Sequence, residues 1–328
     1  MKIINIENLK TFAEEGAARH GIPGMGAALI KNGEIVAEHI QGVVDAKGTP
    51  VTEDTLYESA SLTKSLFATL FLRLVDRGMV SLDEPVVAQG APVWSKDPRY
   101  SEITARQCLS HGTGLPNWSK QPMPFKFDPG TSYSYSGEGY YLLQHLAEIK
   151  LGKDWPSIMR EEFFTPWGMS AEVIWTPEIS PRISNGFDDK GKVRKIRTKV
   201  DKDKVSAEPN AAWSLYANAR LYAQFICHMM NDRCGLSEGS FAEMLKAQNH
   251  AGENVDWGLG WGLTDGCAWH WGDNGGYKNF AVWDPETREG AVVFTNSDSG
   301  MPFYMELLGK LTEGLDLASV KSFIDGAE

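Results

Sequence analysis

The sequence predicts a single α+β domain, in which one sheet is closed by both ends of the chain and a helical region is inserted between them. β-prone runs lie near both ends, whereas apolar residues at helical spacing fill the middle. The chain has 328 residues, 42% of them hydrophobic, which is enough for one large core. We assign the α/β part to about residues 1–75 and 250–328, and the helical region to about 76–249.

The first third of the chain carries the clearest local signals. A helix is expected from Ile6 to His20, ending at Gly21. Two β-prone runs in GMGAALIKNGEIVAEHIQGVVD meet at Asn32-Gly33, which predicts a hairpin. Leucines spaced four residues apart in SLTKSLFATLFLRLVDRG then predict a helix that ends at Gly78.

Further helices and strands are expected along the rest of the chain. The expected helices are Thr104 to Ser110, Gly139 to Lys150, Trp155 to Phe164, Ser214 to Asn231, and about Met301 to Leu315. The expected strands are Trp257 to Leu263, Tyr277 to Trp283 and Gly290 to Asn296. This order is the basis for a sheet that the two termini close.

The charge pattern argues against nucleic acid and membrane partners. A net charge of −11 disfavours both a nucleic acid and an anionic membrane surface. The most apolar run, Leu66 to Val75, contains Arg73 and is too short to cross a bilayer. Glu7 and Lys10 interrupt the stretch that a signal peptide would need, so we expect a cytoplasmic protein. An exported mature form is the alternative.

The cysteines show no C-x-x-C pairing and are too sparse for a disulfide framework. We therefore interpret them as four buried thiols, with disulfide pairing in an exported form as the alternative. These cysteines are Cys108, Cys227, Cys234 and Cys267.

A basic stretch runs from Asp188 to Lys204. We interpret it as a solvated loop with a glycine-containing turn at Asp189-Lys190-Gly191. The alternative is a mobile flap that closes over a functional site.

A nucleophile and a base are suggested by Ser61-Leu62-Thr63-Lys64. If the helix starts at or just before Ser61, residues three apart share a face and the lysine amine lies beside the hydroxyl. A serine needs a base to become a nucleophile, and a lysine can be that base when burial lowers its pKa. The tetrapeptide alone is common by chance, so its context decides.

The sequence resembles the serine β-lactamase and penicillin-binding-protein superfamily, specifically its class C branch, in which S-x-x-K is followed by Y-x-N and by K-T-G or H-x-G. The resemblance implies a cofactor-free serine hydrolase with an α/β/α sandwich. In that fold, an antiparallel sheet is flanked by the terminal helices beside an all-helical region, and the site lies at their junction. The segments that carry the resemblance are TLYESASLTKSL, LVDRGMVSLDEPV, ITARQCLSHGTGLPNW, PGTSYSYSGEGYYLLQHL, WPSIMREEFFTPWGM, WGLGWGL and HWGDNGGYKNF.

The resemblance also implies the catalytic roles. Ser61 is the nucleophile and Lys64 its base, and Tyr135 in Tyr135-Ser136-Gly137 matches the family tyrosine that shuttles a proton. Cations nearby would lower the pKa of this tyrosine. Tyr133 and Tyr140 are rivals that only the motif alignment excludes.

The third motif of the family matches His270-Trp271-Gly272 on a strand edging the site. The resemblance places the oxyanion hole at the backbone N–H groups of Ser61 and Asp273, where two donors would stabilise a tetrahedral intermediate. His270 has no clustered ligands beside it, so no metal is expected. His111, in a family loop, is expected to be structural.

Two departures from the family concern the substrate. Gly137 stands where the family has the asparagine of Y-x-N, and Trp271 where it has a threonine. We expect Trp271 to narrow the cleft and form an apolar wall. The loss of both polar groups disfavours β-lactams and D-Ala-D-Ala termini. The Asp273 side chain either holds a substrate amine or points to solvent.

Hydrolysis of a carboxylic ester or small amide through an acyl-enzyme on Ser61 is the leading hypothesis. A D-specific aminopeptidase or amidase, an acyltransferase or a β-lactamase is the alternative within enzymes, all with a small-molecule ester, amide or peptide as partner. A non-catalytic binder of the same fold is the alternative outside enzymes. The sequence makes no prediction of the oligomeric state.

Overall fold

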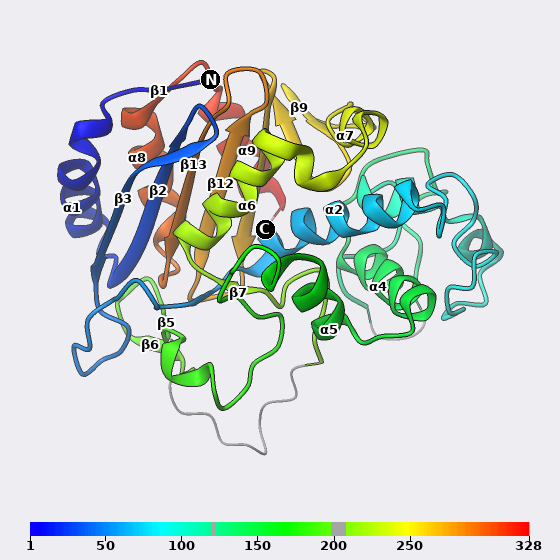
Figure 1. Ribbon diagram of the computed structural model, residues 1–328, viewed down its shortest axis with the longest axis horizontal. Helices are drawn as coiled ribbons and strands as arrows, with labels where there is room; N and C mark the ends of the chain where they lie inside the picture. The colour runs from blue at the N-terminus through cyan, green and yellow to red at the C-terminus, as the bar shows by residue number, and fades with distance from the viewer. Residues whose placement is uncertain (120–122, 198–207, 328) are drawn as a thin grey trace.

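A large antiparallel sheet organises the protein, as Figure 1 shows. The computed structural model describes residues 1–119, 123–197 and 208–327. Within these ranges the main sheet has eight strands in the order β3-β2-β13-β12-β11-β10-β9-β8, and all neighbours are antiparallel. Its strands are β2 (Gly24–Lys31), β3 (Glu34–Gly42), β8 (Asn249–Gly252), β9 (Val255–Trp257), β10 (Gly262–Thr264), β11 (Cys267–Asp273), β12 (Lys278–Asp284) and β13 (Glu289–Thr295).

The two ends of the chain meet inside this sheet. The N-terminal hairpin turns at Asn32-Gly33 as expected, and its strand β2 pairs with β13 from the C-terminal part of the chain. Short two-stranded pairs complete the strands that the structure describes. They are β1 (Lys2–Ile3) with β14 (Thr312–Glu313), β4 (Tyr57–Glu58) with β7 (Tyr216–Ala217), and β5 (Gly186–Phe187) with β6 (Val193–Lys195).

Helices cover both faces of the sheet, and further helices extend from one end of it (Figure 1). Apolar side chains of α1, α8 and α9 form one buried cluster with one face of the sheet, and those of α2, α4 and α6 form another with the opposite face. The helices are α1 (Leu9–His20), α2 (Thr63–Asp76), α3 (Ala105–Leu109), α4 (Gly137–Leu151), α5 (Trp155–Met159), α6 (Ala219–Asp232), α7 (Glu238–Met244), α8 (Gly300–Leu311) and α9 (Leu317–Ala327).

Side chains along β11 point alternately to one cluster and to the other. Trp269 and Trp271 point to the cluster with α1, α8 and α9, whereas Ala268 belongs to the cluster with α2 and α6. Successive strand residues face opposite sides, so His270 and Gly272 lie on the same side as Ala268. That side faces α2, and β11 contacts the turn that leads into it.

Three expected elements differ from the structure. The expected helix from Ser214 begins only at Ala219, because Tyr216 pairs with β4 and Asn218 caps α6. The expected strand from Trp257 to Leu263 is two strands, since the chain turns at Gly260, whose φ is +87°. The final helix ends at Leu311, and α9, which the sequence analysis did not predict, follows it.

In the part of the chain that the structure describes, no helix is both long and apolar enough to cross a membrane. All four cysteines are free, as expected. Three of them are buried, but Cys227 is partly exposed, which corrects the expectation of four buried thiols.

We predict that Asn218→Ala destabilises the protein by about 2 kcal/mol. An N-cap alone contributes about 1 kcal/mol, and this side chain also donates hydrogen bonds to two carbonyl groups. Asn218 accepts from Leu221 N–H at 2.9 Å and donates to the carbonyls of Glu53 and Thr55. Urea unfolding of both proteins measures the difference.

Asn8→Ala is the matched control, because Asn8 occupies the N-cap of α1 without a side-chain capping bond. Its free energy of unfolding should change by less than about 0.5 kcal/mol. Equal losses in the two variants would contradict the capping argument.

Candidate active site

Ser61 and Lys64 are held side by side at the start of α2. Ser61 lies in a 3-10 turn, Ala60–Leu62, that runs directly into the helix. The Lys64 Nζ lies 3.0 Å from Ser61 Oγ and donates to the carbonyl of Ala212 at 2.8 Å. Ala60 has a φ of +52°, a conformation that is unfavourable for a residue with a side chain. Strain of this kind is frequently found at functional sites.

The amine of Lys64 is almost completely shielded from water. The residue is 1% exposed, and its burial lowers the pKa well below the usual 10.5. The described residues place no carboxylate in an ion pair with it, so nothing offsets the cost of burying a charge there. Burial therefore favours the neutral amine, the form that can accept a proton from the serine.

Tyr135 covers this pair from the loop before α4. Its ring centroid lies 4.7 Å from Lys64 Nζ, and its ring packs against His111 at 4.2 Å. The hydroxyl oxygen is buried and has no well-formed hydrogen bond among the described residues. Burial raises the pKa of Tyr135, and the Ser61 hydroxyl only partly opposes it. The expected lowering of this pKa is wrong, because burial of the phenol is the dominant effect on it.

The rival tyrosines have other surroundings. Tyr140 donates its hydroxyl proton to the carbonyl of Leu109 at 2.9 Å, and its ring lies 5.6 Å from Lys64 Nζ, farther than that of Tyr135. Tyr133 stacks edge-on against His111, with 5.9 Å between ring centroids. The geometry therefore brings Tyr135 nearest to the Ser61 and Lys64 pair.

The second half of β11 lies against the turn that carries Ser61. A Cβ atom on Gly272 would lie 2.2 Å from the carbonyl oxygen of Ser59, so only glycine permits this approach. β10 pairs with β11 only along Cys267 to Trp269. The strand edge from His270 onward is therefore left open toward Ser61 in the described structure.

Asp273 ends this strand, and both of its carboxylate oxygens are occupied. One accepts from Lys278 Nζ at 2.5 Å and the other from the backbone N–H of Gly275 at 2.9 Å. Asp273 and Ser61 line the same cavity, of about 360 Å³. Lys278 and Gly275 thus hold this side chain in place, and its role in holding a substrate amine stays a prediction.

His270 and His111 are both buried and neutral. His270 donates from Nδ1 to the carbonyl of Trp271 at 2.7 Å, and burial lowers its pKa to about 3. His111 accepts from the N–H of Ser136 at 3.1 Å, and burial lowers its pKa as well. No three His, Cys, Asp or Glu side chains within the described ranges form a group that could hold a metal ion.

Trp271 and Gly137 do not lie where a substrate would contact them. Trp271 is 5% exposed and packs on Tyr135, with 5.0 Å between ring centroids, and on Phe323 of α9. The expected apolar wall of the cleft is therefore wrong for Trp271, which supports Tyr135 from behind. At Gly137, a Cβ atom would lie 2.5 Å from the ring of Trp118, which covers this position.

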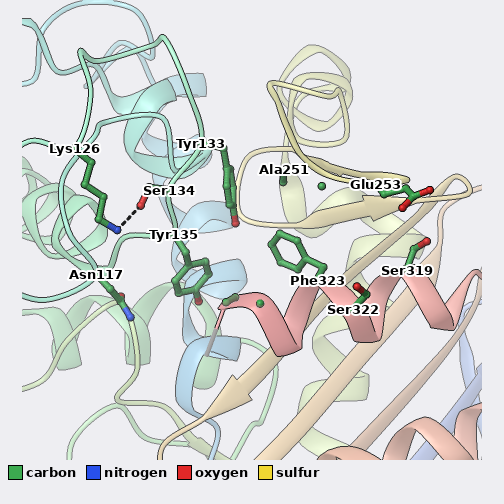
Figure 2. Close-up of a pocket in the computed structure, with 13 residues that line it drawn as sticks. Asn117, Lys126, Tyr133, Ser134, Tyr135, Ala251, Glu253, Ser319, Ser322 and Phe323 are labelled. Atoms are coloured by element: carbon green, nitrogen blue, oxygen red, sulfur yellow. Dashed lines mark hydrogen bonds between the residues drawn. The ribbon is translucent and has the colours of Figure 1, made fainter.

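A second cavity of about 510 Å³ is lined in part by Tyr135 (Figure 2). Phe323, Ser319 and Ser322 of α9 form one wall of it, and Lys126, which donates to Ser134 Oγ at 2.8 Å, lies on the opposite wall. Asn117 lines both this cavity and the one at Ser61.

The basic stretch contributes side chains to the cavity at Ser61. Lys195 and Arg197 both bond the buried carboxylate of Glu58, at 3.1 and 2.5 Å, and all three residues line the cavity. The solvated-loop interpretation is therefore wrong for these two residues, although the turn at Gly191 exists as expected. Residues 198–204 of the stretch lie outside the described residues.

The sequence matches the family model for beta-lactamase over residues 9–311. The chain belongs to the beta-lactamase family. Members of the beta-lactamase family are serine hydrolases, so the chain is an enzyme of that class. The family resemblance and the α+β fold class are both confirmed.

The similarity to individual relatives covers different shares of this chain. Penicillin-binding protein 4 of Amycolatopsis lactamdurans is 24% identical over 349 residues, covering 89% of this chain and 85% of that protein. Esterase EstB of Burkholderia gladioli is 37% identical over 118 residues, but these cover only 34% of this chain and 29% of EstB. The structure of D-amino acid amidase from Ochrobactrum anthropi SV3 with L-phenylalanine amide has a TM-score of 0.75 at 24% identity, covering 96% of this chain and 98% of that one.

Sequence reasoning missed several residues that line the cavity at Ser61. Glu58, Asn117 and Trp118 lie within the segments that carry the beta-lactamase resemblance, so their position could have been noticed there. Trp213 had no local signal, since it reaches the cavity only through the fold.

We predict that Gly272→Ala lowers acylation of Ser61 at least tenfold and costs about 1–3 kcal/mol of stability, because the methyl group forces β11 away from Ser59. Labelling by a fluorophosphonate, followed by intact mass, measures acylation, and urea unfolding measures stability.

Gly239→Ala in α7 is the control, since its Cβ would meet nothing closer than 3.9 Å. This variant should label at the normal rate. Normal labelling of Gly272→Ala would show that the close approach of β11 is not needed.

Proposed function

We propose that the protein hydrolyses carboxylic esters or small amides through an acyl-enzyme on Ser61. The observation that carries the proposal is the buried amine of Lys64 at 3.0 Å from Ser61 Oγ, with its pKa lowered by burial. A serine hydroxyl becomes a competent nucleophile when such a base takes its proton. The partial similarity to esterase EstB supports an ester substrate.

Acylation begins when Ser61 Oγ attacks the carbonyl carbon and its proton passes to Lys64 Nζ. The negative charge that develops on the carbonyl oxygen is stabilised by the N–H groups of Ser61 and Asp273. The bond to the leaving group then breaks as Tyr135 donates its phenolic proton to the leaving atom. The proton on Lys64 returns to Tyr135, so the acyl-enzyme forms with all three side chains neutral.

Deacylation repeats these steps with water. A water molecule attacks the acyl carbonyl and its proton passes to Lys64 Nζ, with Tyr135 beside it. Ser61 Oγ leaves and takes that proton back, which regenerates the starting state. The raised pKa of Tyr135 suits this cycle, because the tyrosine must be a protonated acid when the leaving group departs.

The proposed substrate is a small molecule, and esters are favoured over amides of amino acids. Asp273 is the acidic side chain that the sequence suggested for holding a substrate amine, and Lys278 already pairs with it. A D-amino acid amidase or aminopeptidase activity is the second candidate within this mechanism. The four free cysteines support a cytoplasmic location.

We predict that Ser61→Ala lowers kcat/KM for p-nitrophenyl butyrate by at least about 1,000-fold, because it removes the nucleophile. The same variant should gain no mass with a fluorophosphonate. Ser101→Ala, at an exposed serine outside the cavities described above, serves as the control. Retained activity in Ser61→Ala, or an adduct on another residue, would refute the proposed nucleophile.

We predict that kcat/KM for this ester falls as the pH drops through the lowered pKa of Lys64, since the protonated amine cannot accept a proton from Ser61. Above that pKa the amine is neutral, so the profile should level off at a pH well below 10.5. A pH profile of kcat/KM tests this. A rate that continues to rise up to the ordinary lysine value of 10.5 would mean that burial does not lower the pKa.

A further inference from the structure

A third cavity continues from the one at Ser61. It has a volume of about 540 Å³, and the indoles of Trp118 and Trp213 line both cavities. An acyl group attached to Ser61 would therefore pass these two side chains to enter it. Tyr135 lines the cavity in Figure 2 and does not line the third cavity, so the leaving group, which must receive its proton from Tyr135, belongs on the side of the cavity in Figure 2. The third cavity is on the acyl side.

Aromatic rings form much of the wall of this third cavity. Trp94 stacks on Tyr141 of α4, with 5.4 Å between ring centroids and an interplanar angle of 29°. Trp118 is 49% exposed, which is unusual for an indole. Faces of tryptophan and tyrosine attract cations through their electron-rich centres.

Two carboxylates lie among these rings. Glu138 is 7% exposed, and one of its oxygens accepts from the N–H of Ser119 at 2.8 Å. Glu208 is exposed and accepts from the hydroxyl of Tyr141 at 3.3 Å. The described residues that line this cavity include no lysine or arginine. Burial raises the pKa of Glu138, a cost that a bound cation would offset.

The cavity at Ser61 has the opposite character. Lys195 and Arg197 line it, and together they pair with the single carboxylate of Glu58. A cationic group next to the scissile carbonyl would meet these two side chains. A cationic group farther along the acyl chain would reach Glu138 and Glu208 instead.

We propose that the third cavity is an acyl subsite that binds an ammonium group carried by the substrate's acyl chain, several bonds from the scissile carbonyl. This inference rests on the proposed function, in which Ser61 takes up the acyl group. The walls of the subsite are the side chains of Trp94, Trp118, Tyr141 and Trp213. Its negative charge comes from Glu138 and Glu208.

The test compares p-nitrophenyl esters of butanoic, hexanoic and octanoic acid with the same esters bearing a terminal trimethylammonium group. For at least one chain length, kcat/KM should be roughly tenfold higher for the cationic ester, mainly through a lower KM. Esters ending in a carboxylate should be poorer than the neutral ones. Equal values for neutral and cationic esters at every length would overturn the subsite, as would a preference for a neutral terminal phenyl group over the ammonium group.

Variants test whether the two carboxylates carry the preference. In Glu138→Gln/Glu208→Gln the amide oxygens retain the acceptors for Ser119 and Tyr141, so only the charge is removed. The ratio of cationic to neutral kcat/KM should fall toward one in this variant. Glu102→Gln, at an exposed glutamate outside these cavities, should leave the ratio as it is. An unchanged ratio in the double variant would overturn the assignment.

A binding measurement separates this inference from the proposed function. Calorimetry on Ser61→Ala compares the amides of the same cationic and neutral acids, which need no turnover. Tighter binding of a cationic amide supports the subsite even if no ester is hydrolysed, and hydrolysis without such a preference supports the proposed function alone. Equal binding of both amides would overturn the subsite.

Discussion

The exclusion of water from one amine is the constraint on which the site depends. Lys64 is buried with only a serine hydroxyl and a carbonyl as hydrogen-bond partners, and this holds its pKa low. Tyr135 covers the amine, and His111 and Trp271 both pack against the ring of Tyr135. Lys64 belongs to α2, Tyr135 to the loop before α4 and Trp271 to β11. The exclusion of water from the amine therefore depends on all three elements.

The same burial determines what the neighbouring groups can do. Burial raises the pKa of Tyr135 and lowers the pKa of both buried histidines, which stay neutral. Full charges lie farther out, where Glu58 and Asp273 pair with basic side chains beside the cavity. The structure therefore combines an uncharged centre, in which protons can move, with a charged rim that can select among substrates.

The parts of the site that follow from local geometry were predictable from the sequence. Ser61 and Lys64 are one helical turn apart, and the N-terminal hairpin follows from Asn32-Gly33. Contacts between distant segments were not predictable. Arg197 bonds to Glu58, which lies 139 positions earlier in the sequence. Trp118 covers Gly137 from a loop, and a loop has no repeating pattern from which the direction of a side chain could be predicted. The substrate residues were therefore harder to predict than the catalytic ones.

The contact between Gly272 and Ser59 also has a consequence for how the enzyme matures. These residues are more than 200 positions apart, so their contact closes a long loop and forms late in folding if folding follows the usual dependence on sequence separation. α2 with Ser61 and Lys64 can form early by local interactions, but its serine then has no strand edge beside it. A partly folded chain would carry the nucleophile without its oxyanion donors. Reactivity would thus arise only with the completed sheet, so a partly folded chain would carry a serine that is not yet activated for acylation.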